Sequence, residues 1–250
     1  MLYILYHMSY PKSTSCGEIG LILHKIFDAV LPYKTDGTFI EIGANDGKTG
    51  SFTYNLAKIG WKGINCEPVP RLYNLCCENH KHHKNVINLQ LACGEKKEVL
   101  QIIDADTLST IDKDMENIYK TLNWSKYNFH NNQNYISINV DKLDTILSDN
   151  NIKHIDLMVL DVEGYEENVL KGFSIEKYNP SIFIIEIPDQ HPDFKNNKSL
   201  MDKFKILRNY FNENNYTLLV NDVVDNVYIH NSIYNEKLKN NYNIKFSQYM

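Results

Sequence analysis

Short β-rich runs alternate with helically spaced segments along most of this 250-residue chain. The runs that we expect to form strands are residues 38–42, 63–66, 86–93, 98–103, 137–140, 155–160 and 181–187. Segments whose apolar residues recur three and four positions apart, as in amphipathic helices, are residues 15–31, 51–59, 71–80, 143–147, 166–171 and 200–211. This alternation predicts a parallel sheet with right-handed crossovers. Residues 216–220 and 226–230 flank an Asn/Asp-rich turn and indicate a closing hairpin.

Chain length and composition favour one domain, because 250 residues with 43% hydrophobic content can bury one sizeable core. We divide the chain into a flanking segment (1–37), a ligand-binding domain (38–230) and a peripheral tail (231–250). Residues 104–136 are polar and only weakly periodic, so we expect a variable insertion or lid there.

The charge balance disfavours nucleic acid and anionic lipid as partners, since 26 basic and 31 acidic residues give a net charge of −5. Five cysteines without a C-x-x-C pair suggest neither a disulfide framework nor a zinc site. The first ten residues are apolar but lack a cationic start and a cleavage site, and no window approaches a membrane span. A cytoplasmic protein with reduced thiols is expected.

The most informative segment is FIEIGANDG at residues 39–47, a β-rich run that ends in a glycine turn. Gly43 and Gly47 have no Cβ and can adopt positive φ, so a ligand is expected to approach the backbone there. Glu41 places an acceptor carboxylate beside the turn. The spacing G-x-x-x-G differs from the G-x-G-x-x-G that cradles a diphosphate, and it suits a cationic, amine-bearing ligand better.

Two more acidic positions follow predicted strands. Glu67 ends the next strand, where folds of this type bind a ribose diol. Asp161 and Glu163 follow the buried run 155–160, and they are expected to face the same crevice, because ligands of open parallel sheets bind outside the carboxyl ends of the strands. The alternative is that Asp161 only caps the helix that begins near Tyr165.

These segments, in this order, resemble the FkbM-type family of S-adenosylmethionine-dependent methyltransferases. The resemblance covers roughly residues 16–186. The matching segments are residues 39–47, Ser51, Thr53, GWKG at 60–63, Glu67-Pro68, DVEG at 161–164, VLKG at 169–172, Ile185-Glu186 and, upstream, Gly17-Glu18.

The resemblance implies an α/β class I methyltransferase (Rossmann-like) fold, with a seven-stranded, mostly parallel sheet whose antiparallel strand comes from the C-terminal hairpin. It also implies S-adenosylmethionine as cofactor and methyl transfer to oxygen on a sugar, glycan or related small molecule. The residues it assigns to the cofactor are Glu41, Gly43, Asn45 and Gly47 for the methionine part, Glu67 for the ribose, and also Ala44, Ser51, Pro68 and Asp161. The candidate catalytic residues are Asp161 as base, with Glu163 and Glu186.

Three alternatives stay open. Asp161, Glu163 and Glu186 are also candidate ligands of a divalent metal such as Mg²⁺, which prefers oxygen donors. The acceptor is alternatively RNA, as in a cap 2′-O-methyltransferase, although no Lys/Arg cluster supports this. The domain is alternatively a non-catalytic nucleoside binder.

The histidine-rich string at residues 80–83 is expected to be a solvated loop on the side opposite the crevice.

Overall fold

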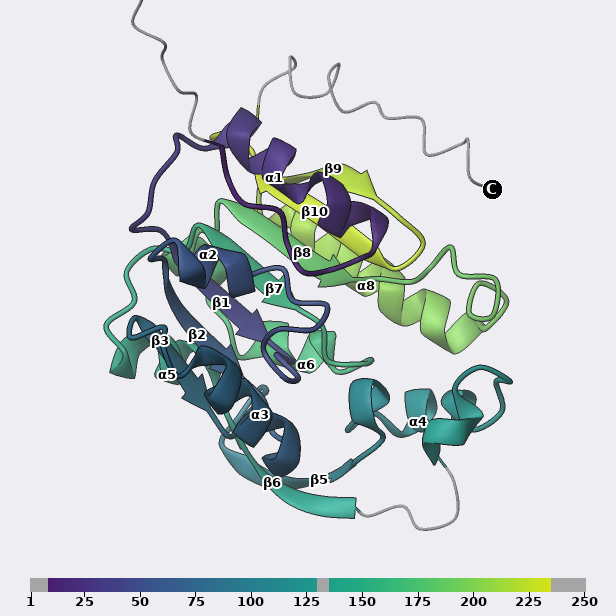
Figure 1. Ribbon diagram of the computed structural model, residues 1–250. Coiled ribbons are helices and arrows are strands. Elements are labelled where there is room, and N and C mark those ends of the chain that lie inside the picture. The colour runs from purple at the N-terminus through teal and green to yellow at the C-terminus, as the bar shows by residue number, and fades with distance from the viewer. Residues whose placement is uncertain (1–8, 130–134, 235–250) are drawn as a thin grey trace, which may run out of the picture.

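A seven-stranded sheet forms the centre of the molecule (Figure 1), in a computed structural model that describes residues 9–129 and 135–234. Its strand order is β3-β2-β1-β7-β8-β10-β9. The strands are β1 (Thr38–Ile42), β2 (Lys62–Cys66), β3 (Val86–Leu89), β7 (Leu157–Leu160), β8 (Ile182–Glu186), β9 (Tyr216–Asn221) and β10 (Asp225–His230). All neighbours pair in parallel except β10, which runs antiparallel to β8 and to β9. The predicted class I methyltransferase fold and its antiparallel hairpin strand are confirmed.

The strand register brings the carboxyl ends of the four central strands to one edge of the sheet. Ile42 at the end of β1 lies level with Cys66 of β2 and with Leu160 of β7. Leu160 in turn lies level with Ile185 of β8. The residues that follow each of these positions therefore meet at the same edge, as the sequence predicts.

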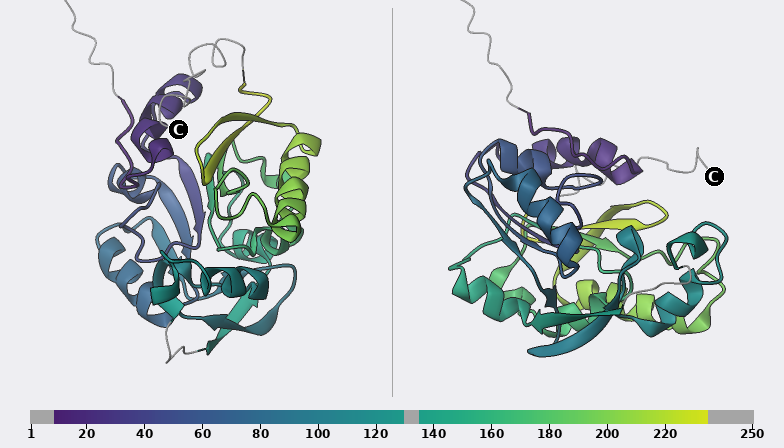
Figure 2. Two further views of the ribbon diagram at one scale, coloured as in Figure 1. Left: turned by 90° about the vertical axis from the view of Figure 1, so that its right-hand side faces the viewer. Right: turned by 60° about the horizontal axis from the view of Figure 1, so that its bottom comes forward.

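Helices cover both faces of the sheet (Figure 2). One face carries α1 (Glu18–Val30), α2 (Tyr54–Lys58) and α3 (Pro70–His80), and the other carries α5 (Leu143–Asp149), α6 (Glu166–Lys171) and α8 (Lys198–Glu213), with the short α7 (Ile175–Tyr178) beside them. Successive strand residues point to opposite faces. Phe39 thus packs in the core that includes α1 and α2, and Ile40 in the core that includes α5, α6 and α8.

A smaller sheet lies beside the main one, with the order β4-β6-β5. Its strands are β4 (Ala92–Cys93), β5 (Glu98–Ile103) and β6 (Tyr135–Asp141). The single strand predicted over residues 86–93 is wrong, because β3 ends at Leu89 and the chain then leaves the main sheet to pair with β6. Periodicity identifies extended segments but not their partners, so the second sheet was not visible in the sequence.

The polar region after β5 forms a unit that we call the α4 segment, residues 104–129. It contains the 3₁₀ turn η1 (Asp106–Leu108), α4 (Lys113–Tyr119) and the 3₁₀ turn η2 (Lys126–Phe129). Asp112 caps α4 by accepting from the N–H groups of Asp114 and Met115, and Lys203 of α8 binds the same carboxylate. The carboxyl ends of the central strands point toward the α4 segment (Figure 1).

Parts of three predictions lie outside the described residues, namely the apolar start at residues 1–8, residues 130–134 of the expected insertion, and the tail at 235–250. Within residues 9–129 and 135–234, no helix is long and apolar enough to cross a membrane.

Candidate functional site

A cavity of about 280 Å³ lies at the edge where β1, β2 and β7 end. Nine of the predicted site residues line it: Glu41, Gly43, Ala44, Asn45, Ser51, Glu67, Pro68, Asp161 and Glu163. Gly47 and Glu186 are not part of the lining. Residues 106–109 and Ile111 of the α4 segment complete the wall. No Lys, Arg or His occurs among the described residues that line the cavity, and five of its side chains are carboxylic acids.

The two glycines of the β1 turn let other parts of the protein approach the backbone closely. At Gly43 (φ 82°) an added Cβ would lie 1.7 Å from the Asp161 carbonyl oxygen, so this glycine allows the ends of β1 and β7 to approach closely. At Gly47 (φ 68°) an added Cβ would lie 2.5 Å from the Cys76 Sγ of α3. The positive φ values agree with the sequence prediction, and Gly43 lines the cavity, so the approach of a ligand to the backbone there stays a prediction.

Glu41 is buried at the base of the cavity and holds the segment before α2. Its Oε2 accepts from the Ser51 hydroxyl at 3.0 Å and from the Thr53 hydroxyl at 2.6 Å. Ser51 Oγ in turn accepts from the N–H groups of Thr53 and Tyr54. Burial raises the pKa of Glu41 to about 7, although these hydrogen bonds favour the charged form. Ser51 and Glu41 therefore line the cavity and also fix its wall.

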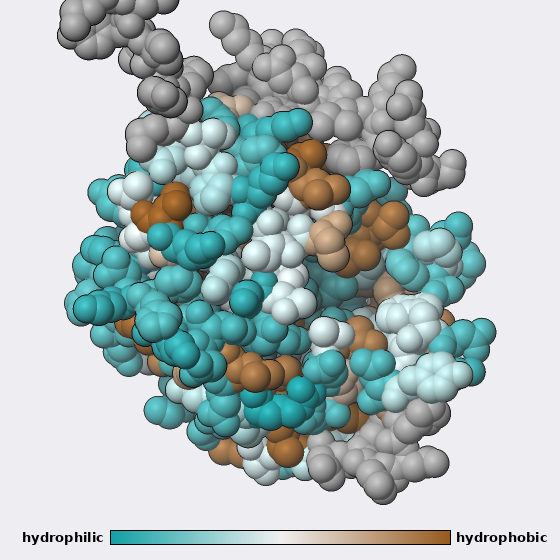
Figure 3. All heavy atoms as spheres, viewed as in Figure 1, coloured by the Kyte–Doolittle hydropathy of each residue, from teal (hydrophilic) through white to brown (hydrophobic). Residues whose placement is uncertain are grey.

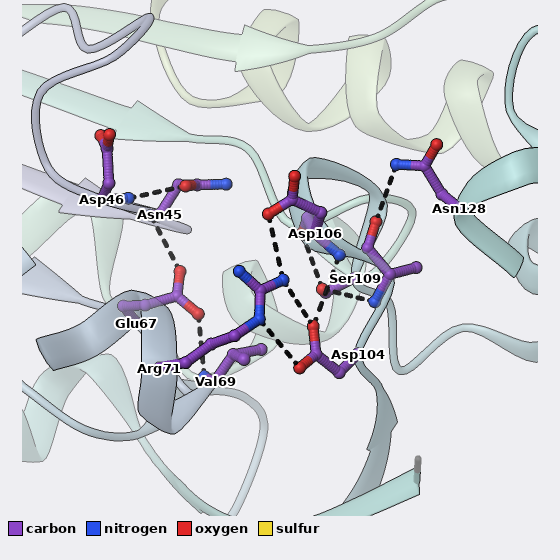
Figure 4. Close-up of polar contacts among 10 residues, drawn as sticks. Asn45, Asp46, Glu67, Val69, Arg71, Asp104, Asp106, Ser109 and Asn128 are labelled. Carbon is purple, nitrogen blue, oxygen red and sulfur yellow. Dashed lines mark hydrogen bonds and ion pairs between the residues drawn. The ribbon is translucent and has the colours of Figure 1, made fainter. Parts of the chain in front are cut away.

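Glu67 at the end of β2 bridges two backbone turns (Figure 4). Its Oε2 accepts from the Asn45 N–H and its Oε1 from the Val69 N–H, each at 2.8 Å. Burial raises the pKa of Glu67 to about 7. A carboxylate has about four acceptor sites, so Glu67 can hold both turns and still accept from a diol.

An arginine beside Glu67 ties the α4 segment to α3, as Figure 4 shows. Arg71 forms ion pairs with Asp104 at 2.9 Å and with Asp106 at 3.0 Å. Asp106 lines the cavity and begins η1. Sequence reasoning missed this contact, since residues more than thirty positions apart are joined only by the fold.

An apolar slot adjoins Glu67 in the same cavity. The side chains that form it come from the turn after β2, α3, the small sheet and the α4 segment: Pro68, Leu72, Ala92, Cys93, Ile102 and Ile111. Such a slot suits a flat apolar ring, with a carboxylate beside it for the attached ribose. Of these residues only Pro68 was predicted, because the others depend on the unforeseen second sheet.

Three carboxylates meet at the ends of β7 and β8. Asp161, Glu163 and Glu186 each offer one oxygen, and these oxygens lie within 4.8 Å of one another. Burial raises the pKa of all three, and the negative charge of Asp161 raises those of Glu163 and Glu186 further. The exposed surface of Asp161 faces the cavity that it lines. The structure thus brings together the three predicted catalytic residues, which we call the carboxylate triad.

The α4 segment holds Glu163 in an unusual backbone conformation. Glu163 has a φ of 55°, which costs a non-glycine residue about 1–3 kcal/mol. The Thr110 hydroxyl donates to its carbonyl oxygen at 2.7 Å, and the buried Tyr119 hydroxyl donates to its carboxylate. Neither residue was foreseen, because nothing in the sequence links the weakly periodic insertion to the triad.

Asp161 does not cap the following helix. The residue at the N-cap of α6 is Tyr165, which makes no side-chain cap. Glu166 instead accepts from the N–H groups of Val162 and Gly164, each at 3.2 Å. The alternative in which Asp161 is only a helix cap is therefore wrong.

The histidine-rich string is solvated only in part, because Lys81 and His82 are exposed as expected but His80 is not. His80 is 3% exposed, and its Nε2 lies 2.7 Å from the Gly47 carbonyl oxygen, beneath the turn that follows β1. His83 Nδ1 lies 3.0 Å from His80 Nδ1. Burial lowers the pKa of both imidazoles. The last turn of α3 thus supports the glycine turn, and no local sequence pattern indicates this contact because it joins two separate elements.

The sequence matches the family described as Methyltransferase FkbM domain over residues 41–218, which is more than two thirds of the chain. The chain belongs to this family. The FkbM domain is a methyltransferase domain of the S-adenosylmethionine-dependent kind. The matched region contains the whole cavity lining and the carboxylate triad. A search of curated proteins finds no match.

Solved structures with a similar arrangement include the precorrin-6y C5,15-methyltransferase of Geobacter metallireducens, with 9% identity, a TM-score of 0.46, and coverage of 88% of this chain and 98% of that one. Fibrillarin of Methanococcus jannaschii has 14% identity, a TM-score of 0.42, and coverage of 84% and 74%. An O-methyltransferase from Bacillus cereus, in complex with SAH, has 10% identity, a TM-score of 0.41, and coverage of 78% and 74%.

The donor set of the cavity fits S-adenosylmethionine. Glu67 would accept from the ribose hydroxyls, and the apolar slot would hold the adenine ring. The sulfonium and the amino group are cationic, and the lining offers carboxylates without a competing basic side chain.

Proposed function

We propose that this FkbM domain is an O-methyltransferase that transfers a methyl group from S-adenosylmethionine to a hydroxyl of a neutral acceptor, a sugar, a glycan or a related small molecule. The observation that carries the proposal is the carboxylate triad, which lies beside the cofactor cavity and at the carboxyl ends of β7 and β8. A hydroxyl acceptor must lose a proton during transfer, and a carboxylate is a suitable acceptor for it.

When bound, S-adenosylmethionine supplies an electrophilic methyl group on a positively charged sulfur. The main task of the chain is to orient the acceptor hydroxyl toward this methyl group. In well-oriented reactions such positioning lowers the activation barrier by up to about 7–11 kcal/mol. Asp161 lines the cavity, so it is our candidate for the base that takes the hydroxyl proton as the new O–C bond forms and the C–S bond breaks. Burial raises the pKa of Asp161 and so strengthens it as a base, and three carboxylates this close do not all ionise readily.

RNA is the less favoured acceptor. Phosphate contacts supply much of the affinity of nucleic-acid-binding proteins, whereas the described cavity lining contains five acids and no basic side chain. A non-catalytic nucleoside binder is also disfavoured, because nucleoside binding alone does not require three carboxylates to be held close to one another. A cytoplasmic location remains a prediction from the sequence.

A divalent metal is an alternative use of the triad, since hard cations take carboxylate oxygens and can polarise a hydroxyl. The two uses differ in one measurable respect. A metal-dependent enzyme loses transfer when treated with EDTA and regains it with Mg²⁺, whereas a carboxylate base is indifferent to the chelator.

The deciding experiment compares the wild type with Asp161→Asn and Asp161→Ala, and uses Asp149→Asn as a variant of an exposed acidic residue of α5 outside the cavity lining. Binding of S-adenosylmethionine is measured by calorimetry, and methyl transfer by release of S-adenosylhomocysteine with a panel of saccharide acceptors. We expect the Asp161 variants to bind the cofactor within about tenfold of wild type but to lose transfer by about 10²-fold or more. A fully active Asp161→Asn variant would remove Asp161 from the mechanism.

A further inference from the structure

A row of aromatic side chains leads outward from the carboxylate triad. We call it the aromatic wall; it consists of Tyr119, Trp124 and Phe129 from the α4 segment and His191 and Phe194 from the loop after β8. Its inner end is Tyr119, which is 1% exposed and donates to the Glu163 carboxylate. Phe129 and Phe194 are also buried. The wall therefore connects the reacting end of the site with the surface.

The outer end of the wall is Trp124, whose side chain is 49% exposed although its position is fixed. Its indole N–H donates to the Asp193 carboxylate at 2.8 Å. The rings of Tyr119 and His191 lie 5.8 and 6.0 Å away at interplanar angles of 69° and 57°. Neither ring stacks flat on the indole, so Trp124 keeps apolar ring surface for a ligand.

The surface around Trp124 is formed by the α4 segment and the loop after β8. Figure 3 shows pale side chains over the α4 segment and brown ones over the β9–β10 turn, where Val223 and Val224 are partly exposed. The segments that form the surface around Trp124 follow β5 and β8, and the triad lies at the ends of β7 and β8. Trp124 is linked to the triad through Tyr119, whose ring contacts the indole and whose hydroxyl donates to Glu163.

The chemistry of this surface favours a neutral saccharide. A pyranose ring has an apolar C–H face that packs on an indole, and hydroxyl groups around its edge that donate to carboxylates. Trp124 supplies the flat apolar surface, and the charged group in contact with it is the acidic side chain of Asp193. An aromatic ring also stacks with nucleobases, but a nucleic-acid chain would bring its phosphates toward Asp193 and the triad.

We propose that Trp124, with Asp193 at its edge, is an outer acceptor subsite that stacks one sugar ring of a neutral glycan while another ring presents its hydroxyl at the triad. This inference rests on the proposed function and makes it more specific. It assigns the α4 segment a role in acceptor specificity, beyond closing the cofactor cavity.

The test uses the intrinsic fluorescence of the protein. Of its two tryptophans, Trp61 is fully buried and Trp124 is half exposed, so acrylamide quenching reports chiefly on Trp124. The protein, loaded with S-adenosylhomocysteine, is titrated with methyl pyranosides and with neutral di- and trisaccharides. We expect at least one saccharide to protect Trp124 from acrylamide, and oligosaccharides to protect it more than the methyl pyranosides do.

Variants connect this binding to turnover. We expect Trp124→Ala to raise KM for oligosaccharide acceptors by tenfold or more, with little change in kcat, and Trp124→Phe to restore most of the lost affinity because it keeps a flat ring. The matched control is Tyr127→Ala, an exposed aromatic residue three positions away. Cofactor affinity and melting temperature of each variant are measured in parallel.

The outcomes separate the two proposals. If S-adenosylhomocysteine binds and transfer to a hydroxyl occurs, but Trp124→Ala keeps its KM or no saccharide protects the indole, the subsite is wrong and the proposed function stands. If cofactor binds but no hydroxyl acceptor is methylated, the proposed function fails. Protection by a short oligonucleotide at low salt, without protection by saccharides, overturns the subsite in favour of nucleobase stacking.

Discussion

The Glu67 carboxylate already accepts two backbone N–H groups, those of Asn45 and Val69, without any ligand. It is nevertheless so well buried that its pKa rises to about 7. A diol that donates to this group would favour its ionised form, so cofactor binding and proton release are coupled at a single side chain.

We therefore expect cofactor affinity to depend on pH. Below about pH 7 part of the protein carries a proton on Glu67 that binding must displace, so affinity weakens by up to about tenfold per pH unit as the pH falls. Above the pKa this contribution becomes constant. Calorimetry at pH 6, 7 and 8, in buffers of different ionisation enthalpy, measures both the affinity and the protons released.

The control for this prediction is Glu67→Gln. It should bind S-adenosylmethionine about 10–100-fold more weakly at pH 8, because a hydrogen bond to a charged group contributes about 1.5–3 kcal/mol. The variant should also lose the part of the pH dependence of affinity that comes from Glu67. The part that comes from the amino group of the ligand should be the same for both proteins. Equal affinities of variant and wild type would contradict the ribose assignment.

At the scale of elements, the α4 segment contributes more than a cover for the cavity. It holds the backbone and the carboxylate of Glu163 through Thr110 and Tyr119, and it is itself anchored by Arg71 of α3 and by Lys203 of α8. An element that forms no part of the main sheet thus fixes one member of the triad.

Tyr119→Phe tests this role, because phenylalanine keeps the buried ring and removes only the hydroxyl that binds Glu163. We expect kcat to fall by about tenfold or more, since loss of a hydrogen bond to a charged group costs about 1.5–3 kcal/mol. Cofactor affinity should not change. Steady-state kinetics and calorimetry on the same preparations measure the two quantities.

The matched control is Tyr216→Phe. Tyr216 is also buried and donates its hydroxyl to the Pro180 carbonyl oxygen at 2.7 Å, at a site remote from the triad. Both variants should lose a similar, small amount of stability, and only Tyr119→Phe should lose turnover. If both variants kept full kcat, the contact between Tyr119 and Glu163 would have no part in the reaction.

At the scale of the whole molecule, burial of acidic groups makes stability depend on pH. Glu41 has its pKa raised from 4.5 to about 7, so between these values the native protein keeps a proton that the unfolded chain releases. The free energy of unfolding therefore falls as pH rises through this window, by at most about 3 kcal/mol for this group. His80, whose pKa burial lowers from 6.5, acts oppositely and loses its stabilising contribution as the pH falls below that value.

Glu41→Gln should reduce the loss of stability between pH 5 and pH 8. The amide keeps an oxygen that can accept from Ser51 or Thr53, but it cannot ionise. The free energy of unfolding of the variant should therefore rise relative to that of the wild type as the pH rises. Urea unfolding at pH 5 and pH 8 measures the difference, with the exposed Glu78→Gln as control. A difference between Glu41→Gln and wild type that is the same at both pH values would show that Glu41 does not titrate in this range.

Much of this molecule follows from local sequence. The apolar runs at 38–42, 63–66 and 181–187 and the helical spacing between them determine the parallel sheet, because backbone geometry translates those periods into strands and helices. Acidic residues near the carboxyl ends of the strands must then meet at one edge, so the sequence predicts the place of Glu41 inside the first strand and of Glu67 and Asp161 directly after theirs.

Only the tertiary structure decided what those residues touch. The division of 86–93 between two sheets, the hold of Tyr119 and Thr110 on Glu163, and the packing of His80 beneath Gly47 join positions that lie far apart along the chain. Periodicity records which side of an element is buried, but it carries no information about the partner, since packing and desolvation arise only when the elements come together. For the same reason, the pKa values that set the chemistry of the site belong to the fold and not to the sequence motif.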